Sequence, residues 1–102
     1  MKVDITVEAE RDLAEAAEFY EMQDAGVGEY FMRTLVAEID ALEHTGGIHR
    51  RKWGFHRALS ATFPFVVFYL VIDGMISVRA VFDCRRDPKS LRQRIADRRI
   101  GE

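Results

Sequence analysis

The residues best suited to chemistry in this chain are basic side chains gathered in its second half. They occupy a loop, two predicted strands and the exit of a predicted β-hairpin: Arg50, Arg51, Lys52, Arg57, Arg79, Arg85 and Arg86. A surface on which such groups converge would bind phosphates, and with a proton acceptor at a ribose 2′-hydroxyl it would cleave RNA without a metal. For any single arginine, a solvated charge or a pair with an acidic side chain is the simpler account.

Other kinds of catalytic site find no support in the residue pattern. His44, His49 and His56 lack the spacing to cysteines or carboxylates that metal sites use. The chain also lacks a glycine-rich phosphate loop and a serine or cysteine nucleophile motif. We therefore expect no metal and no cofactor, and we expect Cys84 to be a small buried thiol at a strand end.

Length and composition set the class of protein. A chain of 102 residues suits one domain with one core, so we expect a single domain spanning residues 1–102. Hydrophobic residues at 48% and charged residues at 31% are typical of a globular protein. The single cysteine, the polar start and an apolar run about half the length of a membrane span predict a cytoplasmic protein without a membrane segment.

Charge is distributed unevenly along the chain. Residues 1–45 carry 12 acidic and 3 basic side chains, a net charge of -9, whereas residues 46–102 carry 5 acidic and 12 basic ones, a net charge of +7. A basic half suggests an anionic partner, either nucleic acid or an acidic protein segment. Mutual neutralisation of the two halves in the folded domain explains the asymmetry equally well.

The elements that must position the basic residues follow from hydrophobic periodicity and turn signals. A strand at residues 2–7 precedes a helix capped by Thr6, and a short turn at residues 23–28 leads into an antiparallel second helix that ends at Gly46. After a basic loop at residues 48–54, we predict strands at residues 56–62, 63–72 and 75–83 and a last helix that begins at Pro88. The predicted fold is therefore α+β, with an N-terminal strand, an antiparallel helical hairpin, a three-stranded antiparallel meander that completes a small sheet, and a short C-terminal helix.

The hairpin at residues 63–88 is the central element of this prediction. Asp73 and Gly74 are typical of a type I′ turn. Its first strand is apolar on both faces, with Phe65, Val67, Tyr69 and Val71 opposite Val66, Phe68, Leu70 and Ile72. Its second strand is expected to place Ile76, Val78, Ala80 and Phe82 on one face and Ser77, Arg79, Val81 and Asp83 on the other. The helical hairpin can cover one face of the sheet, so the other face needs the C-terminal segment, with Leu91, Ile95 and Ile100 as its apolar stripe, or a partner protein.

Several of these features together resemble the RelE/ParE superfamily of toxins from toxin–antitoxin pairs. The likeness spans nearly the whole chain and rests on the element order and on the following residues: Glu8 to Leu13, Phe63-Pro64-Phe65, Phe68-Tyr69, Asp73-Gly74, Ala80-Val81-Phe82 and Arg85-Arg86-Asp87-Pro88. It implies a growth-inhibiting toxin that a cognate antitoxin neutralises in a hetero-oligomer. We expect the antitoxin to contact Phe65, Val67, Tyr69, Val71, Leu91 and Ile95.

Two branches of the superfamily imply two targets. The RelE branch cuts messenger RNA on the ribosome, and this activity would use Arg85, Arg86 and Lys52 with His56 as the base. The ParE branch poisons DNA gyrase. Many relatives carry a histidine where this chain has Asp83, and an ionised aspartate is a poor proton shuttle at neutral pH. This departure favours a ParE-like toxin that uses the basic residues to bind its target, with a ribonuclease or an inactive binding module as the alternatives.

Overall fold

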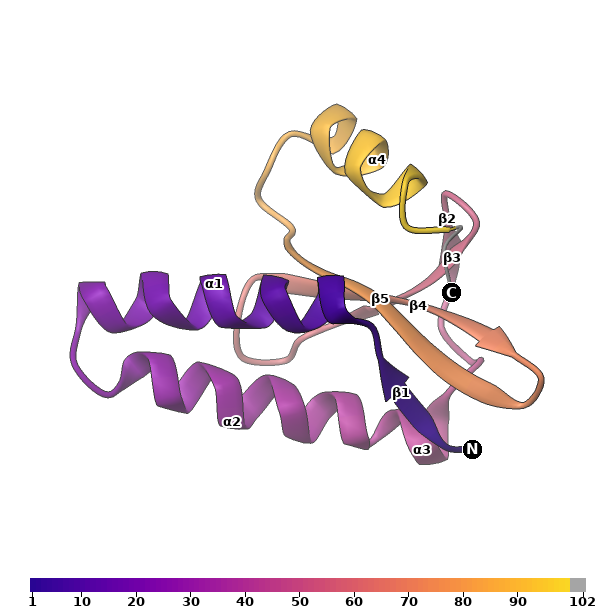
Figure 1. Ribbon diagram of the computed structural model, residues 1–102, viewed down its shortest axis with the longest axis horizontal. Coiled ribbons are helices and arrows are strands. Elements are labelled where there is room, and N and C mark those ends of the chain that lie inside the picture. Colours follow the sequence, from indigo (N-terminus) through magenta and orange to yellow (C-terminus); the bar gives the residue numbers. More distant parts are fainter. Residues whose placement is uncertain (100–102) are drawn as a thin grey trace.

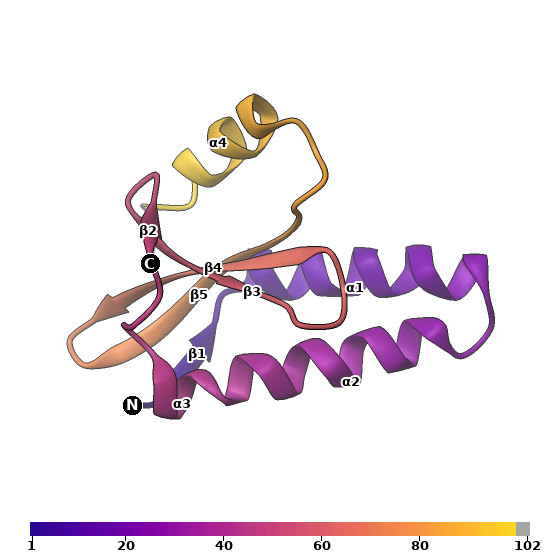
Figure 2. The same cartoon turned by 180° about the vertical axis from the view of Figure 1, so that it is seen from behind.

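A mixed sheet with helices on both faces forms the framework of the computed structural model, which describes residues 1–99 (Figures 1 and 2). Its elements are β1 (Val3–Ile5), α1 (Val7–Gln23), α2 (Val27–Asp40), α3 (Leu42–Thr45), β2 (Arg51–Lys52), β3 (Phe55–Leu59), β4 (Phe65–Ile72), β5 (Met75–Asp83) and α4 (Pro88–Ala96). The strand order is β1-β5-β4-β3-β2, with β1 parallel to β5 and the remaining pairs antiparallel. The α+β class and the predicted order of elements are confirmed. Among residues 1–99, no helix combines the length and the apolar content needed to cross a membrane.

The helical hairpin forms where the sequence predicts it. The Thr6 hydroxyl oxygen accepts a hydrogen bond from the Ala9 backbone N–H at 3.3 Å and caps α1. The Glu21 carboxylate accepts from the N–H groups of Gly26 and Gly28 and closes the turn between α1 and α2. Gly28 is needed because a Cβ at this position would collide with the Ala17 carbonyl oxygen across the helix pair.

The β4–β5 hairpin has the predicted turn, with positive φ angles of 51° at Asp73 and 76° at Gly74. The predicted loop at residues 48–54 instead contains β2. Trp53 and Gly54, with φ angles of 57° and 87°, reverse the chain between β2 and β3. The basic loop is therefore an extension of the sheet.

The strand β4 is buried on both faces from Phe65 to Tyr69, as its sequence predicts, whereas Val71 and Ile72 at its end are exposed. One core lies between the sheet and the α1–α2 hairpin and includes Phe31, Leu35, Phe65, Val67 and Tyr69. The other lies between the sheet and α4 and includes Phe55, Phe68, Phe82, Leu91 and Ile95. The C-terminal helix, one of the two expected covers, thus closes the second face, while Ile100 lies outside the described residues.

The predicted faces of β5 are wrong beyond Val78 because the strand contains a β-bulge at Arg79. Phe68 pairs with Ala80 but Tyr69 pairs with Val78, so Arg79 is the additional residue in β5. Ile76 and Val78 face the helical hairpin, whereas Ala80 and Phe82 face α4. Without the bulge, the alternation of side chains would have kept these four residues on one face.

A buried ion pair completes the edge of β5 beyond the end of β1. The Asp12 carboxylate of α1 accepts a hydrogen bond from the Val81 backbone N–H at 3.0 Å and pairs with the Arg98 guanidinium. Arg98 also donates to the Arg79 carbonyl oxygen at 3.2 Å, and Arg79 donates in return to the Arg98 carbonyl oxygen at 2.9 Å. We call Asp12, Arg79 and Arg98 the edge network. It satisfies backbone groups that β1 is too short to pair, and it ties the segment after α4 to both α1 and β5.

Loss of one charge from the edge network should destabilise the fold. The side chains of Asp12 and Arg98 are 6% and 17% exposed, so Asp12→Ala leaves Arg98 and the Val81 N–H buried without their partner. We expect a decrease of about 3–5 kcal/mol in the free energy of unfolding. Chemical denaturation checks this value. The control is Arg33→Ala, which breaks the exposed pair with Glu29 and should cost about 0–1 kcal/mol. Equal effects of the two substitutions would contradict the role of the network.

Candidate functional site

Three of the predicted basic residues line one small hollow on the α4 side of the sheet. We call this the basic hollow: Lys52 from β2, Arg57 from β3 and Arg86 from the β5–α4 connection surround a volume of about 50 Å³. The remaining lining residues are Trp53, Val66, Phe68, Cys84, Pro88 and Leu91. Lys52 of the basic loop and Arg86 at the exit of the hairpin therefore lie at one hollow together with Arg57. An apolar floor beneath three cations suits an anionic or amphipathic partner group.

The β2–β3 turn holds one wall of the basic hollow in place. The Trp53 ring packs on Phe68 with a centroid separation of 5.9 Å, and the Lys52 ammonium lies 4.7 Å from the Trp53 ring centroid. The Gly54 carbonyl oxygen accepts a hydrogen bond from Arg99 at 2.9 Å. The position of Lys52 therefore depends on contacts with the sheet and with the segment after α4.

The other predicted basic residues do not line this hollow. Arg79 is 3% exposed and belongs to the edge network, so it is not a surface ligand for a phosphate in this structure. Arg50 and Arg51 are exposed near the β2–β3 turn, and Arg51 donates to the Gly54 carbonyl oxygen at 3.4 Å. Cys84 is exposed, and the prediction of a buried thiol was therefore wrong.

Arg85 forms an ion pair with Asp83. Its guanidinium donates two hydrogen bonds to the Asp83 carboxylate at 2.8 and 3.0 Å, and its backbone N–H donates a third at 2.9 Å. The side-chain hydrogen bond from Arg85 lowers the pKa of Asp83 more than burial raises it. Asp83 therefore stays ionised at neutral pH and is unsuited to proton transfer.

His56 lies on the opposite face of the sheet from the basic hollow. It pairs across the strands with Tyr69, which belongs to the core under the helical hairpin, and the two rings stack at a centroid separation of 5.0 Å. The Tyr69 hydroxyl also lies 2.7 Å from His49 Nδ1, and burial, with a smaller effect of His56, lowers the pKa of His49. His56 is thus held in a cluster with Tyr69 and His49, and it is not placed to act as a general base on a substrate bound at Arg86.

Most of the residues expected to contact an antitoxin are buried within the chain. Phe65, Val67 and Tyr69 lie beneath the helical hairpin, and Leu91 and Ile95 of α4 pack on the sheet. A partner would have to displace a helix to reach these five side chains. Val71 differs, because it is 40% exposed near the end of the β4–β5 hairpin.

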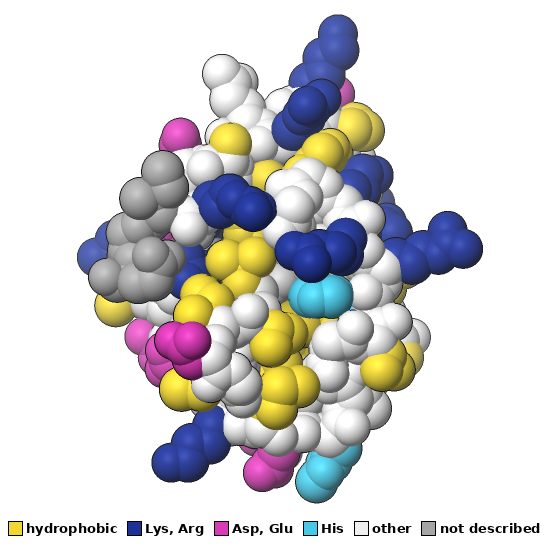
Figure 3. Space-filling view, turned by 90° about the vertical axis from the view of Figure 1, so that its right-hand side faces the viewer, with side chains coloured by type: hydrophobic (Ala, Val, Ile, Leu, Met, Phe, Trp, Pro, Cys, Tyr) yellow, Lys and Arg dark blue, Asp and Glu magenta, His cyan; other side chains and the backbone are white. Residues whose placement is uncertain are grey.

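Exposed hydrophobic side chains gather at that end of the molecule (Figure 3). Val7, Ile72 and Met75 are 57%, 36% and 41% exposed and line an open hollow of about 550 Å³. Val71 is not among the described lining residues of this hollow, and neither are the other residues predicted to contact the antitoxin.

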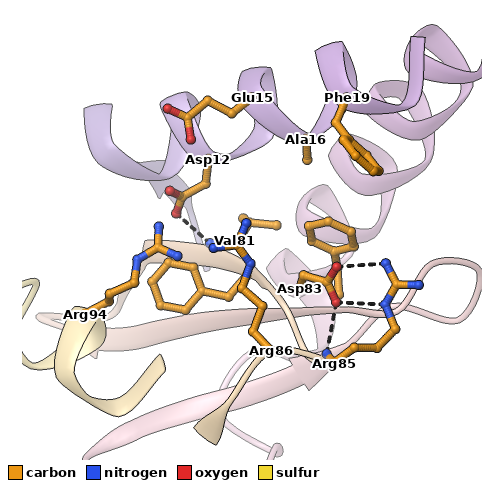
Figure 4. A pocket seen from close by; sticks show the side chains of 11 residues that line it. Asp12, Glu15, Ala16, Phe19, Val81, Asp83, Arg85, Arg86 and Arg94 are labelled. Carbon is orange, nitrogen blue, oxygen red and sulfur yellow. Dashed lines mark hydrogen bonds and ion pairs between the residues drawn. The ribbon is translucent and has the colours of Figure 1, made fainter. Parts of the chain in front are cut away.

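A further cavity, which we call the groove, lies between α1 and the β5–α4 connection and has a volume of about 180 Å³ (Figure 4). Its lining combines acidic, basic and aromatic residues: Asp12, Glu15, Ala16, Phe19, Phe65, Val81, Phe82, Asp83, Arg85, Arg86 and Arg94. Arg86 lines both this groove and the basic hollow. Sequence reasoning missed Phe19 and Arg94, because only the packing of α1 and α4 around β5 brings them together.

Most charges of the two halves remain unpaired with each other. Of the ion pairs within residues 1–99, Asp12–Arg98 is the one that joins the acidic and basic halves. Within the same residues, no three His, Cys, Asp or Glu side chains are grouped to hold a metal ion. Among the ion pairs of residues 1–99, direct neutralisation between the halves therefore comes from one buried contact.

Comparison with known proteins finds a solved structure that shares this fold. No protein-family model and no curated protein sequence matches the chain. Its structure is similar to a chain in the solved structure titled "Chromosomal ParDE TA system from P. aeruginosa", with a TM-score of 0.74. The match covers 81% of this chain and 95% of that chain at 15% sequence identity. This likeness establishes a shared fold with that chain.

The Asp83–Arg85 pair predicts a measurable change in a single pKa. Substituting Arg85→Gln removes the side-chain hydrogen bonds and should raise the pKa of Asp83 toward its ordinary value, whereas Arg92→Gln should leave it unchanged. Because the pKa of Asp83 is depressed in the folded state, the pair contributes to stability at neutral pH and this contribution is lost as the pH falls through that pKa. Carboxyl-carbon NMR titration measures the shift, and an unchanged Asp83 pKa would contradict the assignment.

Proposed function

We propose that this chain is the toxin component of a type II toxin–antitoxin pair and that it poisons DNA gyrase. The observation that carries the proposal is the shared fold, over 81% of the chain, with a protein in a structure whose title names a ParDE TA system. In this account a cognate antitoxin binds the chain in a hetero-oligomer and suppresses its inhibition of growth.

The chemistry of the basic hollow supports binding in preference to catalysis. Its described lining residues provide three cations but include no histidine, aspartate or glutamate to accept a proton. The nearby carboxylate of Asp83 is held ionised by Arg85, and His56 lies on the other face of the sheet. The proposed role of Lys52, Arg57 and Arg86 is therefore to bind an anionic surface of the target.

A DNA-cleavage assay tests this function directly. Purified chain is incubated with gyrase, ATP and plasmid DNA, and cleaved complexes are released with detergent and protease. We expect linear DNA to accumulate with increasing amounts of the chain, and the concentration required to rise at least about tenfold in Arg57→Glu. Arg33→Glu makes the same charge change on the exposed surface of α2 and should have no effect. No linear DNA at any concentration would contradict gyrase poisoning.

A ribosome-dependent ribonuclease is the second candidate, because the structure brings Lys52, Arg57 and Arg86 to one hollow that suits a phosphate. Primer extension on messenger RNA from an in vitro translation reaction would then show cleavage at codon-related positions, and Arg86→Ala would abolish it. The gyrase account predicts intact messenger RNA. If neither gyrase nor messenger RNA is affected and expression of the chain does not slow growth, the chain acts as a binding module alone.

A further inference from the structure

The groove between α1 and the β5–α4 connection has the composition of a peptide-binding surface. Its floor is apolar and consists of Phe65, Val81 and Phe82, each of which is 7% exposed or less. Phe19 projects from α1 beside this floor and is 56% exposed (Figure 4). A large aromatic side chain that is half-exposed over an apolar floor loses more water contact when an apolar side chain enters the groove.

Internal pairing leaves a particular set of charges available in the groove. Asp12 is paired with Arg98, and Asp83 is paired with Arg85. The Arg94 guanidinium lies over the Phe82 ring, 4.6 Å from its centroid, and among residues 1–99 neither Arg86 nor Arg94 has an ion-pair partner. Glu15 is the acidic lining residue that remains, so the available charges are two arginines against one glutamate.

We propose that this groove binds an acidic peptide segment, with one apolar side chain inserted between Phe19 and the floor and with carboxylates on Arg86 and Arg94. A volume of about 180 Å³ is suited to a single large side chain and is smaller than a typical small-molecule pocket. Charge complementarity identifies the occupant as acidic, because the paired carboxylates cannot attract a basic segment and two arginines are left to be neutralised.

A peptide segment bound in the groove would also change the charge of the basic hollow. Arg86 lines both cavities, so a carboxylate that binds it from the groove also removes one of the three cations of the hollow. The inference deepens the proposed function and rests on it, since the segment is then part of the antitoxin. Binding of the partner in the groove would therefore weaken binding of the target at the basic hollow.

Fluorescence anisotropy with a short labelled peptide tests the groove. The probe carries one Phe flanked on each side by Glu, and the comparison peptides replace either every Glu with Lys or the Phe with Ser. We expect the Glu–Phe peptide to bind and the other two to bind at least about tenfold more weakly. Absence of binding, or equal binding of the Lys peptide, would overturn the proposal.

Matched variants locate the binding on the protein. Phe19→Ala and Arg94→Glu should each weaken binding of the Glu–Phe peptide at least about tenfold. Met22→Ala, which trims an 82% exposed side chain of α1 outside the groove lining, and Arg33→Glu on α2 should leave binding unchanged. Circular dichroism confirms that each variant is folded, and if Arg94→Glu is not, Phe19→Ala alone decides. Binding that survives Phe19→Ala and a folded Arg94→Glu would place the peptide elsewhere and refute the proposal.

The peptide-binding assay and the gyrase assay, carried out on the same purified chain, distinguish this inference from the proposed function. Gyrase-dependent DNA cleavage without peptide binding would refute the groove and leave the toxin assignment intact. Peptide binding without gyrase-dependent cleavage would refute the gyrase target, and the groove would stand as a peptide-binding surface.

Discussion

The buried ion pair between Asp12 and Arg98 is the interaction on which the proposed binding surfaces depend. It joins the acidic N-terminal half of the chain to the basic C-terminal half, and it completes the edge of β5 where β1 has ended. Because Arg98 follows α4 directly, the pair also fixes that helix against the sheet. The basic hollow and the groove both have walls near α4, so the geometry of both surfaces depends on this contact.

Much of the fold follows from local sequence signals. The Thr6 cap, the Asp73-Gly74 turn, the doubly apolar β4 and Pro88 at the start of α4 predict elements that the structure confirms. These signals are local because a cap, a turn or a strand period depends on residues a few positions apart. The choice between α4 and a partner as the cover of the second face remained open, since it depends on long-range packing.

The predictions that failed concern features that long-range contacts decide, namely a bulge in a strand and the surroundings of single side chains. The bulge at Arg79 moves Ala80 and Phe82 to the α4 face, and strict alternation cannot anticipate it. Arg79 was predicted to be a surface cation, but the bulge lets it bond to the Arg98 carbonyl oxygen. Phe19 could not be recognised as a groove residue from the sequence, because only the packing of α1 and α4 around β5 places it in the same groove as Arg94.

In the proposed function the target binds on the α4 side of the sheet, and the exposed face of the helical hairpin stays free of the target. Site-specific photocrosslinking tests this claim most directly, with a photoreactive amino acid at Lys89, exposed on α4, or at Arg33, exposed on α2. The account predicts crosslinks to gyrase from position 89 and none from position 33. Crosslinks from position 33 alone, or from neither position under conditions where the chain traps cleaved DNA, would contradict it.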